Sequence, residues 1–114
     1  MESILTSIKK LLGIDAEYTH FDEDIIMHIN SVFGILNRLG VGPASGFRIE
    51  DDTTTWNDYI PSMENFEAVK SYIHLKVKLI FDPPLSSAVL QAMKETIAEL
   101  EFTLNIAAES AIDL

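Results

Sequence analysis

The sequence predicts an all-α domain of about four helices, a short one at the N-terminus followed by three longer amphipathic ones. Apolar residues recur at helical spacing in four segments, and the Asp82-Pro83-Pro84 break divides the last two of them. Two consecutive prolines remove two backbone donors and force the preceding residue out of the α region, so a helix must stop there. The chain has 114 residues, 47% of them hydrophobic, which suffices for one core. We expect a single domain over residues 1–114.

The first predicted helix begins near Ile4 and ends at Gly13, where a C′ glycine is expected. After a short linker, Thr19 and Asp22 resemble a capping box that begins the second helix. The second helix ends at Gly40 and buries one apolar stripe. This stripe consists of Ile25, Ile29, Val32, Phe33, Leu36 and Leu39.

The segment between the second and third helices has no helical period and predicts a hairpin-like insertion. Alternation around Phe47 indicates one strand, residues 53–56 are rich in strand formers, and Glu50-Asp51-Asp52 is the expected turn. An isolated hairpin is marginally stable, so we expect it to pack on the helices through Trp56 or Tyr59.

The third predicted helix runs roughly from Met63 to Phe81 and is apolar on two nearly opposite sides. Such a helix is either central to its domain or shared with a neighbouring molecule. One stripe consists of Phe66, Val69, Ile73, Val77 and Ile80. The other consists of Ala68, Tyr72, Leu75 and Leu79.

The fourth predicted helix runs from about Ser87 to Ala108, and Ser86 and Ser87 are good N-cap residues. Its core-facing side consists of Val89, Met93, Ile97, Leu100, Leu104 and Ala107. Phe102 and Ile106 project from the other side, close to Glu95 and Glu99. We interpret this exposed apolar pair as an interface candidate, because anchors of this kind dominate binding energy.

Composition excludes several classes of protein. A formal charge of −10 repels nucleic-acid phosphates, which argues against a conventional DNA- or RNA-binding protein. The chain has no cysteine, hence no disulfide framework and no zinc–thiolate site. It lacks the pattern of a secretory signal, and its apolar runs are too short for a membrane span. We therefore expect a soluble, intracellular protein.

No motif predicts catalysis or a cofactor. Glu17-x-x-His20 has the spacing used by di-metal carboxylate bundles, but those sites need a second such pair and two further glutamates. The acids at Glu50, Asp51, Asp52 and Asp58 do not match a calcium-binding loop. Neither a glycine-rich phosphate loop nor a Ser, His and acid constellation stands out. We predict that the protein is not an enzyme and binds no metal or cofactor.

One basic row, Lys70, His74 and Lys78, follows the third predicted helix. It is interpretable as a solvated face of that helix. The alternative is an electrostatic contact with an acidic neighbour, such as Glu95, Glu99 and Glu101 of another copy. We favour the solvated face, because ion pairs at an interface rim contribute little energy.

Several segments together are similar to a known family. A short N-terminal helix leads to Phe21-Asp22-Glu23-Asp24-Ile25-Ile26-Met27-His28-Ile29-Asn30, and a Gly-Val-Gly-Pro corner at residues 40–43 precedes a Thr-Trp loop. A helix ending Leu79-Ile80-Phe81-Asp82-Pro83-Pro84 is followed by a final amphipathic helix. In the order of its helices, its length and the amino-acid pattern of its segments, nearly the whole chain resembles the small head-to-tail connector (adaptor) proteins of long-tailed bacteriophages, particularly phages and prophages of Gram-positive hosts.

The resemblance implies a structural virion assembly protein, located at the head–tail junction and in the host cytoplasm during assembly. It implies docking as a dodecameric ring on the portal protein, extension of the DNA channel, and a surface for head-closure or tail proteins. DNA would pass through without specific binding, and no membrane is involved.

The resemblance also implies roles for two segments. Residues 105–114 correspond to a C-terminal tail that reaches toward the portal, with large apolar side chains at Ile106, Ile112 and Leu114. The loop between the second and third helices would face ring neighbours or the channel. Its candidate residues are Phe47, Glu50, Asp51, Asp52 and Trp56.

A closed ring requires two different patches on each subunit. The second stripe of the third helix and the Phe102 side of the fourth are the expected sources. The candidate subunit-interface residues are therefore Tyr72, Leu75, Leu79 and Phe102. Acidic residues lining the channel would suit a conduit to which DNA must not adhere.

The charge also fits a different class, an acidic helical inhibitor or DNA mimic that binds a nucleic-acid-processing enzyme. Against this alternative, the carboxylates are dispersed over helix starts, a loop and the last helix. A small metal-dependent bundle enzyme fails on the number of available ligands.

Overall fold

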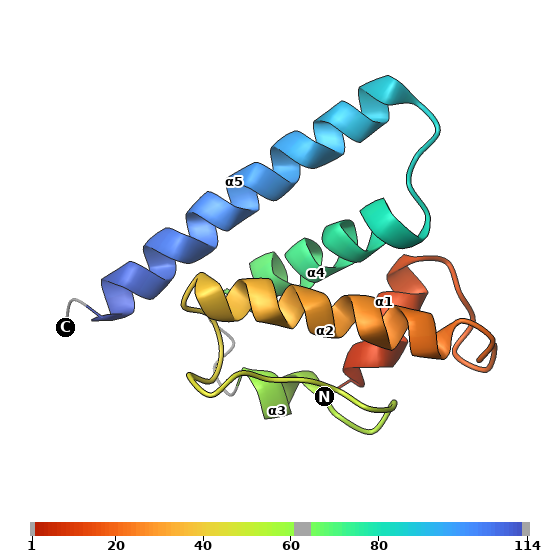
Figure 1. Ribbon diagram of the computed structural model, residues 1–114, viewed down its shortest axis with the longest axis horizontal. Coiled ribbons are helices and arrows are strands. Elements are labelled where there is room, and N and C mark those ends of the chain that lie inside the picture. The colour runs from red at the N-terminus through yellow and green to blue at the C-terminus, as the bar shows by residue number, and fades with distance from the viewer. Residues whose placement is uncertain (1, 61–64, 113–114) are drawn as a thin grey trace.

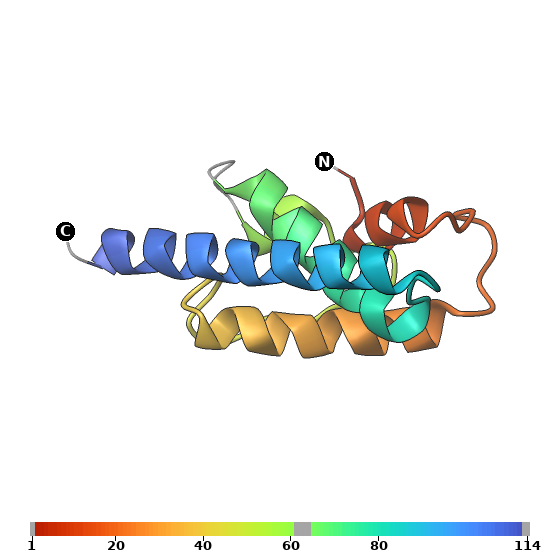
Figure 2. The same ribbon diagram turned by 90° about the horizontal axis from the view of Figure 1, so that it is seen from above.

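The structure, a computed structural model, describes residues 2–60 and 65–112, with side chains for residues 2–60 and 65–109. This part of the chain forms five helices: α1 (Ile4–Leu11), α2 (Asp22–Arg38), α3 (Trp56–Tyr59), α4 (Phe66–Phe81) and α5 (Ser87–Ile112). The molecule is flat, 44 × 36 × 19 Å along its principal axes, and α5 runs along one edge (Figures 1 and 2). The predicted all-α class and the four predicted helices are confirmed, and α3 is an additional short helix.

Helix α4 is central, because it packs against α1, α2 and α5. This position accounts for its two apolar stripes, since Val69, Ile73 and Val77 of one stripe and Tyr72 of the other are all fully buried. The core around α4 draws on every helix. Its other buried apolar members are Ile4, Leu5, Ile8, Ile25, Ile29, Val32, Phe33, Leu36, Ile49, Trp56, Tyr59, Met93, Ile97 and Leu104.

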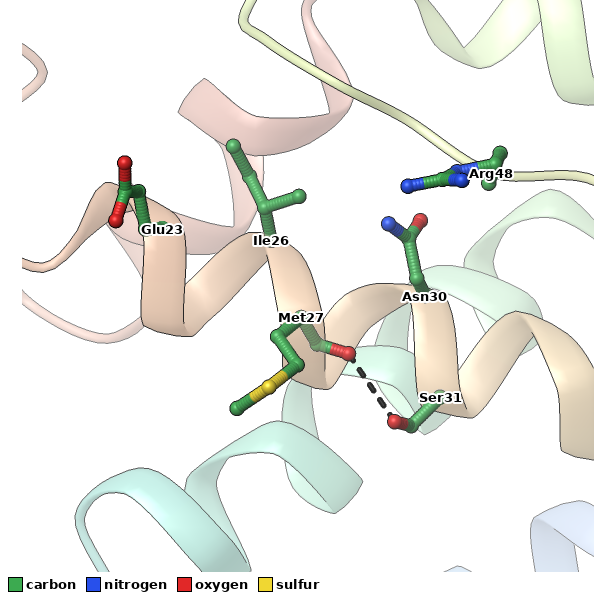
Figure 3. Close-up of a pocket in the computed structure, with 6 residues that line it drawn as sticks. All are labelled: Glu23, Ile26, Met27, Asn30, Ser31 and Arg48. Carbon is green, nitrogen blue, oxygen red and sulfur yellow. Dashed lines mark hydrogen bonds between the residues drawn. The ribbon is translucent and has the colours of Figure 1, made fainter.

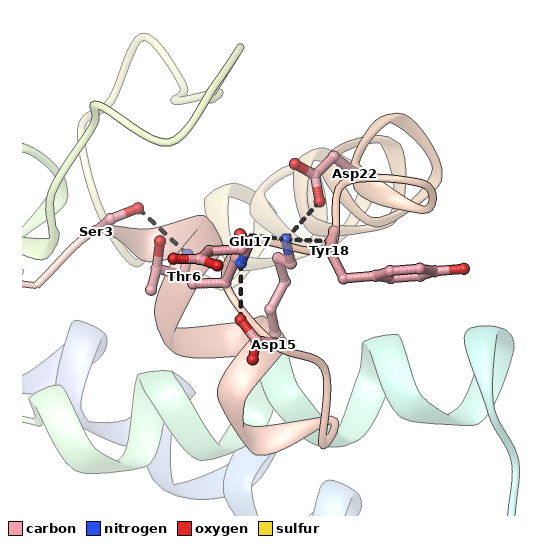
Figure 4. A network of polar contacts seen from close by, with 8 residues as sticks. Ser3, Thr6, Asp15, Glu17, Tyr18 and Asp22 are labelled. Atoms are coloured by element: carbon pink, nitrogen blue, oxygen red, sulfur yellow. Dashed lines mark hydrogen bonds and ion pairs between the residues drawn. The ribbon is translucent and has the colours of Figure 1, made fainter.

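Lys9 is an unusual member of this interior, with 2% of its surface exposed. Its ammonium group donates to the carbonyl oxygens of Ala16 at 3.1 Å and Tyr18 at 2.7 Å, and pairs with the Asp22 carboxylate at 2.8 Å (Figure 4). Burying an ammonium is costly unless its donors are satisfied, and these three oxygens satisfy them. Because all three lie in the linker or the first turn of α2, Lys9 fixes the path of the chain between α1 and α2.

The predicted capping box at Thr19 and Asp22 is wrong. Phe21 is the N-cap of α2 and makes no side-chain capping bond, while the Asp22 carboxylate is paired with Lys9. The ion pair satisfies a buried charge, which is worth more than one capping bond at an exposed helix end. The acidic first turn of α2 still lies at the positive end of the helix dipole, as expected.

The predicted hairpin is also wrong, because the described residues between α2 and α4 contain no pair of strands. Instead, the Ile49 backbone exchanges two hydrogen bonds with the Asn30 side chain of α2, at 2.8 and 2.9 Å. Thr55 forms an isolated bridge with Ser3 at the other end of the segment. The segment therefore bonds to α2 and to the N-terminus, not to itself.

The strand-forming residues before Trp56 lead into α3. Thr55 and Asp58 form a capping box at its start, and both aromatic residues of α3 are buried, which confirms the expected packing through Trp56 and Tyr59. The indole N–H of Trp56 donates to the Ser7 hydroxyl oxygen at 2.9 Å. This buried bond connects α3 to α1.

The predicted break at Pro83-Pro84 is confirmed. α4 ends at Phe81, and α5 begins at Ser87 after the Ser86 side chain accepts the Val89 N–H at 3.3 Å. Phe81 makes an edge-to-face contact with Phe21, with ring centroids 5.3 Å apart, so the end of α4 is fixed against the start of α2.

Two polar contacts add to the apolar packing that holds α5. The Tyr72 hydroxyl of α4 donates to the Glu101 carboxylate at 2.6 Å, and burial together with this carboxylate raises the pKa of Tyr72 above its usual range. The Asn105 side chain reaches the Leu39 carbonyl oxygen, at 3.5 Å, at the end of α2. α5 is thus fixed at its middle and near its C-terminal end.

Gly42 is required by its surroundings, and its replacement by Ala should destabilise the fold. Its φ is +87°, and an added Cβ would lie 2.6 Å from the Tyr59 ring. Gly46, with φ of +92° and no atom within 4 Å of its Cβ position, isolates the backbone cost. We expect Gly46→Ala to lower the free energy of unfolding by about 1 kcal/mol and Gly42→Ala by about 2 kcal/mol or more, measured by urea unfolding. Equal losses in the two variants would show that Tyr59 moves aside without cost.

Candidate interaction surfaces

The side of α5 opposite the core carries exposed apolar residues between carboxylates. Phe102 is 69% exposed and Ile106 is 44% exposed. Glu95 and Glu99 share this face, because steps of three and four residues bring side chains to one side of a helix. We call these four residues the α5 outer patch. The sequence predicted it correctly, since Met93 and Ile97 hold the opposite face of α5 in the core.

A second exposed apolar group lies where α4 and α5 meet. Ile80 is 58% exposed, Val89 is 52% exposed, and Leu85 is as exposed as in an extended peptide, at 104%. We call these three residues the corner patch. Helical periodicity had placed Ile80 and Val89 among the core-facing residues. The double proline offers the only sequence signal for their exposure, because it carries the chain away from the core before α5 begins.

The predicted interface residues of α4 are more enclosed. Tyr72 is fully buried and bonded to Glu101 within the chain, whereas Leu75 and Leu79 are half-buried. A neighbouring molecule therefore has access to parts of Leu75 and Leu79 only. Contact between copies at these two positions stays a prediction.

The predicted loop residues fall into two groups. Trp56 is buried, and the half-buried Phe47 packs against the rings of Phe33 and Tyr59, with centroids 5.2 and 4.9 Å away. These aromatic residues hold the loop onto the helices. The three acids of the loop, Glu50, Asp51 and Asp52, are all exposed.

Asp51 has a local structural role within this acidic group. Its carboxylate accepts hydrogen bonds from the Thr53 hydroxyl at 2.6 Å and the Thr53 N–H at 2.9 Å. These bonds hold the pKa of the Asp51 carboxyl below its usual range. Glu50 and Asp52 make no such side-chain bond within the described residues and are the freer acids of the loop.

The predicted C-terminal tail is helical as far as Ile112, where α5 ends. Its first residues contact the body of the molecule, since Asn105 bonds to Leu39. Ile106 is exposed, the Ile112 side chain is not described, and Leu114 lies outside the described residues.

The basic row on α4 is only partly solvated. The Lys70 ammonium lies 5.7 Å from the centroid of the Phe66 ring, and Lys78 pairs with Asp82 at 3.4 Å. His74 lies between these two lysines and is half-buried. The pKa of its imidazole is lowered mainly by burial and to a smaller extent by the positive charge of Lys78. Neither interpretation of the row is tested by these contacts.

A shallow hollow lies on the exposed side of α2. Five residues of α2 and one of the following segment line it: Glu23, Ile26, Met27, Asn30, Ser31 and Arg48 (Figure 3). Asn30 is engaged with Ile49, and the Ser31 hydroxyl donates to the Met27 carbonyl oxygen. The lining therefore offers mainly the carboxylate of Glu23 and the guanidinium of Arg48 to a ligand.

The described residues contain no cluster of three or more His, Cys, Asp or Glu side chains that could hold a metal ion. Glu17 and His20, the pair with metal-ligand spacing, are both exposed in the linker before α2.

A family model described as "Phage connector protein" matches residues 4–111, which is nearly the whole chain. Comparisons with curated proteins and with solved structures give no significant match. In the part of the chain that the structure describes, no helix has both the length and the apolar character needed to cross a membrane.

Phe102→Asp should leave the fold intact, because the ring is largely exposed. We expect its free energy of unfolding to stay within about 0.5 kcal/mol of the unchanged protein. The matched control is Ile97→Asp, on the core-facing side of the same helix. This substitution buries a carboxylate and should lower the free energy of unfolding by about 3 kcal/mol or more. Urea unfolding measures both, and a large loss in Phe102→Asp would show that Phe102 belongs to the core.

Proposed function

Because the chain belongs to the phage connector protein family, we propose that it is a subunit of a ring at the head-to-tail junction of the virion. Membership of the family gives it a structural role in virion assembly. The match over residues 4–111 carries the proposal. We propose docking on the portal protein and ring closure as its mechanism, with no chemical step. The ring would extend the DNA channel and present a surface to head-closure or tail proteins.

Ring closure needs two different surfaces on each subunit, and exposed apolar groups meet this need. The α5 outer patch is one such surface, and parts of Leu75 and Leu79 on α4 remain accessible. Tyr72, being fully buried, would act within the subunit by fixing α5 through Glu101.

We propose that the C-terminal end of α5 faces the portal. Figures 1 and 2 show that this end of α5 lies at the margin of the molecule, beyond the ends of α2 and α4. A helix end in that position is free to enter a partner. Ile106 lies on the last part of α5 whose side chains are described and would begin the contact, with Ile112 and Leu114 further along.

We propose that the acidic loop, with Glu50 and Asp52, lines the channel or its entrance. Carboxylates there would repel DNA phosphates and keep the passing genome from adhering. The dispersion of the acids over α2, the loop and α5 gives no specific support to the alternative of a DNA mimic, which needs rows of charge that imitate a duplex.

The first test is the solution mass of the protein by light scattering, alone and mixed with the portal protein of the same genome. We expect a ring-sized species in the mixture, and a reduced amount with Phe102→Asp, because a buried carboxylate would oppose the apolar contact. A monomer in both samples would contradict the connector-ring proposal and favour the acidic inhibitor.

The channel proposal predicts slower genome release when the loop becomes basic. We expect particles assembled with Glu50→Lys and Asp52→Lys to form normally and to release DNA more slowly in vitro. Asp51 is left in place, since its carboxylate maintains the turn through Thr53. Glu17→Lys with Glu23→Lys gives the same charge change on another segment. An unaltered release rate in the loop variant would count against the channel position.

A further inference from the structure

Charge is distributed unevenly along the α4–α5 hairpin. Residues 76–94 contain three lysines, Lys76, Lys78 and Lys94, against the single acid Asp82. Residues 95–114 contain four glutamates and one aspartate and no lysine or arginine. In a chain of net charge −10, residues 76–94 around the corner are therefore locally basic, and we call them the basic half; residues 95–114 carry only acidic charges, and we call them the acidic half.

Each half of the hairpin also exposes large apolar side chains. The corner patch belongs to the basic half, and Lys76 lies one helical turn before Ile80. The α5 outer patch belongs to the acidic half and includes Glu95 and Glu99 themselves. Of the three lysines, Lys76 shares a helix face with Ile80, whereas Lys78 pairs with Asp82 and Lys94 lies on another side of α5 from Val89. The corner patch with Lys76 and the acidic α5 outer patch are complementary in apolar character and in charge.

The two patches of one molecule cannot meet each other. Val89 and Phe102 lie on the same helix, 13 residues apart, which corresponds to about 20 Å along its axis. The corner itself is rigid, since Pro83 and Pro84 have fixed φ angles, Ser86 caps α5, and Phe81 is packed on Phe21. Any contact between the two patches is therefore a contact between copies.

We propose that the corner patch of one copy docks on the α5 outer patch of the next copy. Pairing a patch with itself would juxtapose glutamates with glutamates or lysines with lysines, which disfavours a symmetric dimer. A contact between two different patches is heterologous and repeats from copy to copy, so it closes into a ring when the rotation allows. The inference rests on the proposed function for its place in the virion, but it concerns self-association alone.

The absence of cysteine from the chain allows a direct test by crosslinking. Ala88→Cys and Ala98→Cys replace small exposed side chains beside the two patches and keep Leu85 and Phe102, so the doubly substituted protein should fold and retain both surfaces. We treat it with a short bismaleimide, with and without the portal protein, and separate the products by denaturing electrophoresis. We expect a ladder of multimers, because each copy carries both partners of the contact. Ala88→Cys with Glu17→Cys is the matched control and should give no ladder.

The outcomes separate this inference from the proposed function, because portal docking is measured independently by light scattering. A ladder supports the docking of corner patch on outer patch, whether or not the portal protein is bound. A complex with the portal protein but no ladder would overturn the inference and leave the connector proposal standing. A ladder without portal docking would support the inference and contradict the connector proposal. Neither ladder nor docking would overturn both.

Charge exchange provides a second readout of the same contact. Lys76→Glu places an acid beside the corner patch, and Glu95→Lys with Glu99→Lys makes the outer patch basic. Each variant alone should lose the crosslinked ladder when it also carries the two cysteines. A mixture of the two should regain it, since acidic corners then meet basic outer patches and the reverse. Lys10→Glu gives the same charge change as Lys76→Glu at a distant exposed position and should retain the ladder. Failure of the mixture to recover would contradict the proposed electrostatic pairing.

Discussion

The structure depends on the burial of both apolar faces of α4. A helix of this kind is stable only when neighbours cover it on two sides, and here α1 and α2 cover one side and α5 the other. Removing α5 would leave the Tyr72 hydroxyl without Glu101, while removing α1 and α2 would take away two of the three helices that pack against α4. The fold is therefore organised around one helix, and α5 is joined to the rest chiefly through it.

Helical periodicity predicted α1, α2, α4 and α5 because each of these helices buries a regular stripe. What the sequence could not predict depends on partners distant along the chain. The hairpin prediction failed because Ile49 bonds to Asn30, 19 residues earlier, and Thr55 pairs with Ser3. The capping prediction failed because Asp22 is paired with Lys9. Local patterns carry no information about either contact, since the competing partner lies in another element.

The same distinction applies to the surfaces. The exposure of Phe102 was predictable because this residue is out of phase with the core-facing residues of α5, whereas the exposure of Ile80 and Val89 was not. Those two residues obey the core periodicity of their helices, but they lie at the ends that meet at the double proline. Periodicity gives the direction of a side chain and not whether a neighbour lies there. The resemblance to phage connector proteins, confirmed by the match over residues 4–111, supplied the structural role in virion assembly that no residue pattern could.

The arrangement has a consequence for assembly, because both proposed docking patches lie on the α4–α5 hairpin. The angle between successive copies in a heterologous contact determines whether a ring closes or a filament grows. That angle is set by how the corner patch and the α5 outer patch are oriented to each other. The double proline, the Ser86 cap and the Tyr72–Glu101 bond fix this orientation within one subunit. Contacts that stabilise the monomer would thus also determine the curvature of the assembly, and the buried Tyr72 would act on the interface only through the position of α5.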